Sequence, residues 1–314
     1  MKSKKTKYPL HEDFKKWENF NPPLNGLLLP LMQGLMGLLY SSQKSDDACI
    51  VEKVKIPFKD KKKIRALLYS PVQIDNNAPC LVYYHGGGFV LPAGPYHYSY
   101  AKQYALGAKC KVLFVDYPLA PKNKFPTPTK AAFCAYKWII QNADKYSIDP
   151  SRVAVGGDSA GGNISSVISL MAYDNKFILP VGQMLIYPAV GSRKRTKSMD
   201  MFTDTPMCNS KDYKRYCTLY FKNEEQMLTS RYASPINAET MAIYPQTYVE
   251  TAEYDCLRDE AKLFAGMLKM AKVPVVVNNT KQTMHGYDIV EDSSISKNSV
   301  KKRIQFLNKV FNKK

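Results

Sequence analysis

The stretch Gly157-Asp158-Ser159-Ala160-Gly161 decides how this chain is interpreted. A serine flanked by two glycines at this spacing is typical of a sharp turn that leads from a strand into a helix. The apolar run at residues 151–156 predicts the strand, and apolar residues at 164, 167, 168 and 171 follow at helical spacing. This context predicts that the serine hydroxyl projects above the edge of a sheet and acts as a nucleophile.

A second motif, His85-Gly86-Gly87-Gly88-Phe89, stands about 70 residues upstream of the serine. It follows an apolar run at residues 80–84 that predicts another buried strand. A glycine run exposes backbone N–H groups, which are the donors that the oxyanion of an acyl-transfer reaction needs. The two motifs in this order therefore predict acyl-transfer chemistry.

A serine hydroxyl is a weak nucleophile, so it needs a base within hydrogen-bonding reach. In folds with this kind of turn, the catalytic residues follow the chain order serine, acid, histidine. Of the four histidines only His285 follows Ser159, and it stands just after the predicted strand at residues 273–278. We therefore expect His285 to be the base.

The acid that orients the base is expected at the end of the preceding strand, predicted at residues 247–251. Three carboxylates follow there, Glu253, Asp255 and Asp259. Asp259 suits the first turn of the next helix, where a negative charge favours the helix dipole. Asp255 is therefore our prediction for the acid, with Asp259 and Glu253 as the alternatives.

Strand-like and helix-like segments alternate from residue 50 onward, which predicts a parallel sheet with helices on both faces. The first strands have no helix between them, so the sheet should begin with antiparallel pairing. The predicted strands are residues 50–57, 63–69, 80–84, 111–115, 153–156, 183–187, 247–251 and 273–278, and the predicted helices are residues 127–141, 160–172, 257–271 and 293–310. An eight-stranded, mostly parallel sheet that begins in this way indicates an α/β class protein with the α/β-hydrolase fold.

Two regions lie outside this alternation, residues 1–46 and about 191–232. Long segments inserted between regular elements are usually functional. We expect both to form a helical cap over the site, so that residues 1–46 are its N-terminal part and residues 47–314 are the catalytic domain with the cap insertion. The apolar stretch at residues 27–40 is too short for stable membrane insertion. We expect it to pack on the domain and to line the substrate entrance.

The amino-acid composition argues against several classes of function. The chain has 314 residues and a formal net charge of +18, but its lysines are scattered and no nucleic-acid-binding signature accompanies them. Seven cysteines without a Cys-x-x-Cys pair are typical of thiols in a reducing compartment rather than of disulfides or a metal site. The N-terminus lacks the pattern of a signal peptide. These features predict a cytoplasmic protein that uses no metal or other cofactor.

The motifs resemble those of the hormone-sensitive-lipase-like family of α/β-hydrolase esterases, which includes bacterial acetyl esterases. The resemblance covers roughly residues 50–312 and rests on residues 85–89, 116–121, 157–163, 255–259 and 285–287. It implies that Gly87, Gly88 and Ala160 supply the oxyanion N–H groups. It also implies that His85 shapes the glycine loop instead of acting as a base, and that Gly86, Gly157, Asp158 and Gly161 support the two motifs.

Two positions depart from the family pattern. Lys122 stands where the family usually has Glu, and Cys256 stands where it often has Pro. Neither removes a catalytic group, although Lys122 could alter the ion pairing of its loop.

Together, these observations and the resemblance predict a serine carboxylesterase that hydrolyses small-molecule esters with short acyl groups, from acetyl to about hexanoyl. The alternatives are an amidase or deacetylase that uses the same triad on aryl amides, and a non-catalytic binding protein on a hydrolase scaffold. The sequence leaves the physiological substrate open, and also the oligomeric state, including a homodimer.

Overall fold

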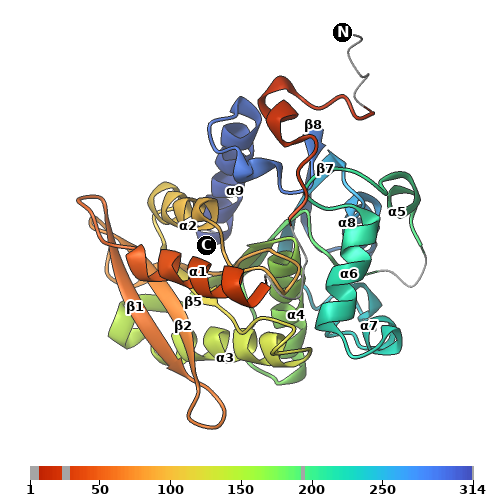
Figure 1. Ribbon diagram of the computed structural model, residues 1–314. Coiled ribbons are helices and arrows are strands. Elements are labelled where there is room, and N and C mark those ends of the chain that lie inside the picture. The colour runs from red at the N-terminus through yellow and green to blue at the C-terminus, as the bar shows by residue number, and fades with distance from the viewer. Residues whose placement is uncertain (1–6, 23–28, 192–194, 313–314) are drawn as a thin grey trace.

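The computed structural model describes residues 7–22, 29–191 and 195–312, and within them eight strands form one sheet (Figure 1). The sheet order is β1-β2-β4-β3-β5-β6-β7-β8. The pairs β1–β2 and β2–β4 are antiparallel, and every later pair is parallel. The strands are β1 (Cys49–Pro57), β2 (Lys63–Pro71), β3 (Ala78–Tyr84), β4 (Lys111–Asp116), β5 (Ile148–Asp158), β6 (Gly182–Ile186), β7 (Gln246–Tyr254) and β8 (Val275–Met284).

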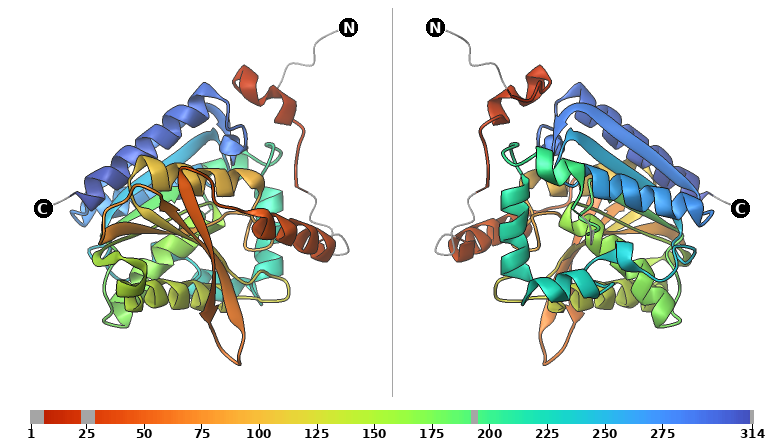
Figure 2. Two further views of the ribbon diagram at one scale, coloured as in Figure 1. Left: turned by 90° about the vertical axis from the view of Figure 1, so that its left-hand side faces the viewer. Right: turned by 90° about the vertical axis from the view of Figure 1, so that its right-hand side faces the viewer.

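Five helices cover the two faces of this sheet (Figure 2). One face carries α2 (Pro95–Gly107) and α9 (Ser294–Phe311), and the other carries α3 (Thr127–Gln141), α4 (Ala160–Asp174) and α8 (Arg258–Met270). The central strands β3 and β6 are buried along nearly their whole length, as expected for strands covered on both sides. The predicted α/β-hydrolase fold, including its antiparallel start, is therefore confirmed.

The helix α2 was not predicted from the sequence. Its buried residues include three tyrosines, a histidine and two alanines, so its apolar side chains do not mark one clear face. Tyrosine combines an apolar ring with a polar hydroxyl, and a helix rich in it has only a weak hydrophobic periodicity. The strand β8 also begins and ends later than predicted, at Val275 and Met284 instead of residues 273 and 278.

The remaining elements lie outside the alternating core. Residues 7–22 contain the short 3₁₀ helix η1 (Glu12–Trp17), and α1 (Leu29–Ser42) follows. The segment between β6 and β7 carries α5 (Lys197–Met201), α6 (Ser210–Tyr220) and α7 (Glu224–Thr229). Three further 3₁₀ turns are η2 (Asp144–Tyr146), η3 (Pro235–Asn237) and η4 (Tyr287–Ile289).

The N-terminal segment lies against the insertion between β6 and β7. The Lys7 ammonium is 2.8 Å from a carboxylate oxygen of Asp204, and the Tyr8 hydroxyl donates to the same carboxylate. Further along, the Met207 N–H donates to the Phe20 carbonyl at 2.7 Å. Two segments far apart in the sequence are thus joined on the same side of the sheet.

None of the helices in the described ranges is both long enough and apolar enough to cross a membrane.

Candidate active site

Three side chains predicted to act together follow the carboxyl ends of parallel strands. Ser159 follows β5, Asp255 follows β7 and His285 follows β8. Because β5 to β8 run parallel, their carboxyl ends meet at one edge of the sheet, where ligands of open α/β sheets bind. The topology therefore brings residues that are up to 126 positions apart into one cluster.

The cluster is a continuous chain of hydrogen bonds. Nε2 of His285 is 2.9 Å from Oγ of Ser159, and Nδ1 of His285 is 2.8 Å from Oδ2 of Asp255. The other oxygen of Asp255 accepts a hydrogen bond from the Leu257 N–H at 2.9 Å. Asp255 is fully buried, so both of its carboxylate oxygens are held by the protein and not by bulk water.

The two alternative acids have other partners. Glu253 accepts a hydrogen bond from the Gln282 N–H at 2.7 Å and forms an ion pair with Lys281. Asp259 accepts from the Ser198 N–H at 2.9 Å and pairs with Arg258. Of the three carboxylates considered from the sequence, the structure places Asp255 against His285.

The electrostatics of His285 follow from this contact. Burial lowers the pKa of an imidazole, but the charge of Asp255 and its hydrogen bond outweigh burial and raise the pKa of His285 to about 9. The ring of Tyr187 packs edge-on against His285, with centroids 4.8 Å apart, and the Tyr187 hydroxyl donates to Asp288 at 2.5 Å. The imidazole is therefore fixed on three sides.

The turn that carries Ser159 is backbone-strained. Ser159 has φ of 53° and ψ of −114°, a backbone conformation that residues other than glycine rarely adopt. A Cβ at Gly157 or Gly161 would lie 2.3 Å or 1.8 Å from the carbonyl oxygen of Tyr84. Both glycines are thus required because β3 passes so close to the turn.

The glycine loop lies opposite the imidazole. Gly87 and Gly88 have positive φ values of 106° and 60°, and both line the same cavity as Ser159 and Ala160. Within the described residues, no backbone carbonyl accepts a hydrogen bond from the N–H of Gly87 or Gly88. The N–H of Ala160, the first residue of α4, also has no acceptor inside its own helix. Three N–H groups are therefore available beside the serine.

Asp158 ties the glycine loop to the turn. Its Oδ1 accepts from the Tyr83 hydroxyl at 2.8 Å and from the Gly86 N–H at 3.0 Å, and its Oδ2 lies 3.1 Å from Nε2 of His97. Nδ1 of His97 accepts from the Gly94 N–H, so Nε2 carries the hydrogen and donates to Asp158. Burial opposes ionisation of Asp158, but the contacts with His97 and Tyr83 lower its pKa.

His85 stands apart from the serine. Its ring is fully buried and stacks on Tyr117 with centroids 4.5 Å apart, and its Nδ1 is 2.7 Å from the Gly86 carbonyl oxygen. Burial lowers the pKa of His85 to about 4, which keeps the ring neutral. The structure thus places His85 in contact with Gly86 of the glycine loop and not with Ser159.

The cavity around Ser159 is small, with a volume of about 90 Å³. Its walls are mostly apolar and aromatic, and they include Tyr213 and Tyr216 from α6, Tyr96 from α2 and Pro22 from the N-terminal segment. A Cβ at Gly88 would lie 2.2 Å from the ring of Tyr216, so this tyrosine packs directly on the glycine loop. The insertion between β6 and β7 therefore forms one wall of the site.

Several residues near the site carry no signal in the sequence. His97 could not be found there, because its partner Asp158 is 61 residues away. Glu260 is buried in α8, where it accepts a hydrogen bond from the Gly191 N–H at 3.2 Å, and burial raises its pKa to about 8. From the sequence, an acidic residue in the first turn of a predicted helix is explained by its favourable interaction with the helix dipole, so Glu260 did not stand out.

The helix α1 packs on the domain, as expected, and residues 27–28 of the predicted apolar stretch lie outside the described residues. It packs on the domain through Leu29 and Tyr40, but its described residues do not line the cavity around Ser159. Its side chain Gln33 binds the carbonyl oxygens of Val90 and Ala120 on the outer side of the glycine loop. An apolar pattern indicates that a helix packs, but it does not identify the surface on which it packs.

The described residues contain no group of three or more His, Cys, Asp or Glu side chains that could hold a metal ion. The seven cysteines are all free thiols.

Comparisons with known proteins extend these observations. A family model described as alpha/beta hydrolase fold matches residues 81–289. Carboxylesterase NlhH of Mycobacterium tuberculosis is 35% identical over 224 residues, or 70% of each chain. Arylesterase of Saccharolobus solfataricus is 32% identical over 220 residues, or 70% of this chain and 71% of that protein. The structure of a bacterial heroin esterase has a TM-score of 0.87 at 27% identity and covers 97% of this chain and 99% of its own.

Proposed function

Because the chain belongs to the hormone-sensitive-lipase-like family of α/β hydrolases and is a carboxylic ester hydrolase, we propose that it cleaves short-acyl esters with a triad of Ser159, His285 and Asp255. The single observation that supports this best is the hydrogen-bonded chain from Asp255 through His285 to Oγ of Ser159. The link between Oγ of Ser159 and Nε2 of His285 has the length that proton transfer from a hydroxyl requires, and the link to Asp255 has the length of a hydrogen bond that orients the imidazole.

The first half of the proposed reaction forms an acyl-enzyme. Neutral His285 accepts the hydroxyl proton at Nε2 while Oγ of Ser159 attacks the ester carbonyl carbon. Asp255 accepts from Nδ1 and stabilises the imidazolium that results. The carbonyl oxygen becomes an oxyanion, the C–O bond to the alcohol breaks, and the imidazolium returns its proton to the leaving alkoxide.

The glycine loop supports the oxyanion in this scheme. Gly87, Gly88 and Ala160 line the cavity beside Ser159, and loss of one N–H donor to an oxyanion typically costs about 3 kcal/mol of transition-state stabilisation. Asp158 and His97 hold the loop in place, so the donors need little rearrangement when charge develops.

In the second half, water replaces the alcohol. His285 removes a proton from the water, the resulting hydroxide attacks the acyl carbon, and the bond to Oγ of Ser159 breaks. The carboxylic acid then leaves and the serine regains its proton. The same two nitrogen atoms thus serve both halves of the cycle.

We also propose that residues 7–22 and the insertion at residues 191–232 act together as the cap. Their mutual contacts at Asp204 and Met207 support this, as does the presence of Pro22 and Tyr216 in the cavity wall. A volume of about 90 Å³ lies well below the roughly 300 Å³ at which cavities begin to hold drug-sized ligands. Such a closed pocket favours acyl groups from acetyl to about hexanoyl over long-chain lipids.

The test is kcat/KM for p-nitrophenyl esters with acyl chains of two to sixteen carbons, measured below and above the micelle concentration. The proposal expects a maximum at six carbons or fewer and no rise when micelles form. A maximum at twelve carbons or more would refute the short-acyl assignment. The matched p-nitroanilides are measured in parallel, and faster cleavage of the anilide than of the ester would identify an amidase instead.

A further inference from the structure

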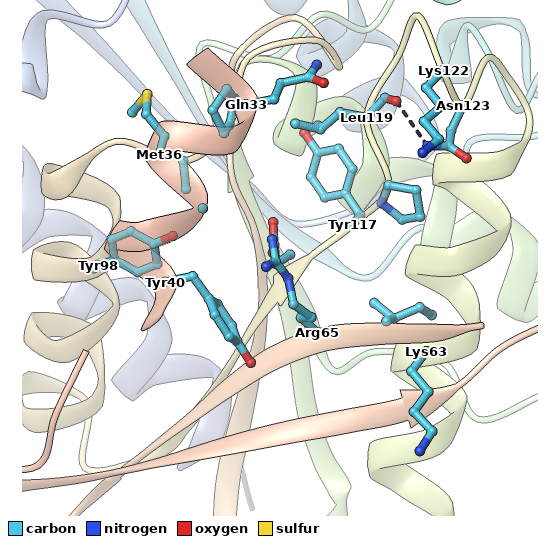
Figure 3. Close-up of a pocket in the computed structure, with 16 residues that line it drawn as sticks. Gln33, Met36, Tyr40, Lys63, Arg65, Tyr98, Tyr117, Leu119, Lys122 and Asn123 are labelled. Carbon is cyan, nitrogen blue, oxygen red and sulfur yellow. Dashed lines mark hydrogen bonds and ion pairs between the residues drawn. The ribbon is translucent and has the colours of Figure 1, made fainter. Parts of the chain in front are cut away.

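The protein has a second cavity, which is larger than the one around Ser159. A cavity of about 330 Å³ lies between α1, the strand β2 and the loop that follows β4 (Figure 3). Its volume falls in the range of small-molecule sites. None of its lining residues also lines the cavity around Ser159. It is therefore a separate space, for which the ester chemistry described above has no use.

Arg65 is the central polar group of this cavity. Its Nε is 2.7 Å from Oδ2 of Asp116, and its guanidinium lies over the ring of Tyr40 at 4.8 Å from the centroid. Figure 3 shows the Arg65 side chain between Tyr40 and Tyr117. The side chain is nevertheless 50% exposed. The contacts hold the guanidinium in one orientation while leaving part of it open to the cavity.

The charges around the cavity favour the binding of an anion. Three residues with cationic side chains contribute to its lining, Lys63, Arg65 and Lys122, against the single carboxylate of Asp116, although Figure 3 shows the Lys63 side chain directed away from Arg65. A guanidinium offers five N–H donors in a planar fork that matches a carboxylate. Because Asp116 occupies only one edge of this fork, Arg65 retains donors for a second anionic group.

The other walls of the cavity are apolar. Met36 from α1, Leu119 from the loop after β4 and Pro92 from the end of the glycine loop all line it. Inorganic phosphate would make no use of such walls, whereas a small organic acid can bury its body against them. We propose that this cavity binds a small organic carboxylate, with its carboxylate on Arg65 and its apolar body against Met36 and Leu119.

The site adjoins the proposed oxyanion loop without overlapping it. Gly87, Gly88, Phe89 and Leu91 of this loop line the cavity around Ser159, and Pro92 and Ala93 line the second cavity. The Gln33 amide holds the loop between the two spaces, through hydrogen bonds of 2.8 Å to the Val90 carbonyl and 3.0 Å to the Ala120 carbonyl. A carboxylate bound here would therefore leave Ser159 accessible.

Isothermal titration calorimetry with benzoate, at constant ionic strength, tests the proposal on the full chain. The protein is first treated with a phosphonate that blocks ester hydrolysis, so that the catalytic cavity is filled. The proposal expects saturable binding of one benzoate, and about tenfold weaker binding in Lys122→Glu because a like charge then faces the ligand. Lys122 is exposed, so this substitution should preserve the fold and the ester hydrolysis of untreated protein.

The matched control is Lys301→Glu, which makes the same charge change at an exposed position of α9 that lines neither cavity. It should leave benzoate binding within about twofold of the original, as expected for a distant screened charge. Equal weakening by both variants would refute the site and indicate a general charge effect. Equal binding of neutral benzamide, or full competition by inorganic phosphate at the same concentration, would also refute an organic carboxylate site.

Discussion

Asp158→Asn tests how the glycine loop is held in place. All three partners of the Asp158 carboxylate are donors, namely the Tyr83 hydroxyl, the Gly86 N–H and Nε2–H of His97. A carboxylate accepts on both oxygens, but the amide of asparagine accepts on only one. In either orientation its NH₂ group would face an N–H, of Gly86 or of His97, which cannot accept in return.

The expected loss follows from these contacts. A hydrogen bond to a charged group contributes about 1.5–3 kcal/mol, and a buried donor left without an acceptor costs about 1–3 kcal/mol more. We therefore expect the free energy of unfolding to fall by about 3 kcal/mol, which corresponds to a Tm lower by roughly 5 °C for a chain of this size. Because Gly86 precedes the proposed oxyanion donors, kcat for a butyrate ester should also fall by about tenfold to a hundredfold.

Thermal unfolding followed by circular dichroism, together with p-nitrophenyl butyrate hydrolysis, measures both effects. The matched control is Asp292→Asn, whose side chain is fully exposed beside Lys297, and its Tm should stay within about 1 °C. If Asp158→Asn shifted Tm by less than about 2 °C and left kcat unchanged, the bracing role of this carboxylate would be wrong.

Three further predictions concern the triad and the pocket walls. The kcat/KM of the original protein should rise with pH as His285 loses its proton near pH 9, and Asp255→Asn should move this rise to lower pH while reducing the rate by about 10⁴-fold. Asp259→Asn should do neither, and a pH profile left in place by Asp255→Asn would contradict the pairing. Gly88→Ala, whose Cβ would lie 2.2 Å from the Tyr216 ring, should reduce ester hydrolysis by about 100-fold or more, and a near-normal rate would exclude this loop from catalysis. Tyr216→Ala should raise kcat/KM for decanoate relative to butyrate by about tenfold, and an unchanged ratio would show that this wall does not limit chain length.

Much of the proposed site could be predicted because its signals are local. A Cβ at Gly161 would lie 1.8 Å from the carbonyl oxygen of Tyr84 in β3, and such a close approach leaves a visible glycine pattern around Ser159 in the sequence. The order of the predicted strands placed Asp255 and His285 at the carboxyl edge of the sheet, although β7 and β8 end later than predicted, at Tyr254 and Met284. The sequence already favoured Asp255 over Asp259 and Glu253, and the structure distinguishes the three carboxylates by their hydrogen-bond partners.

Other features depend on contacts that no local pattern records. His97 acts through Asp158 on another element, and Tyr216 packs on Gly88 from a helix in an irregular insertion. The position of α1 also depends on such contacts. Its apolar side chains indicate that the helix is partly buried, but they do not identify the surface on which it packs. The charged cavity beside it could not be predicted either, since Arg65 and Lys122 come from different elements and line one cavity only in the folded chain.

The most direct test of the central claim is kcat/KM of Ser159→Ala for p-nitrophenyl butyrate, with the fold checked by circular dichroism. If Ser159 is the nucleophile, turnover should fall by about 10⁶-fold while the spectrum stays unchanged, in line with serine deletions in other triads. A folded Ser159→Ala protein that retained more than about a tenth of the original rate would contradict the account.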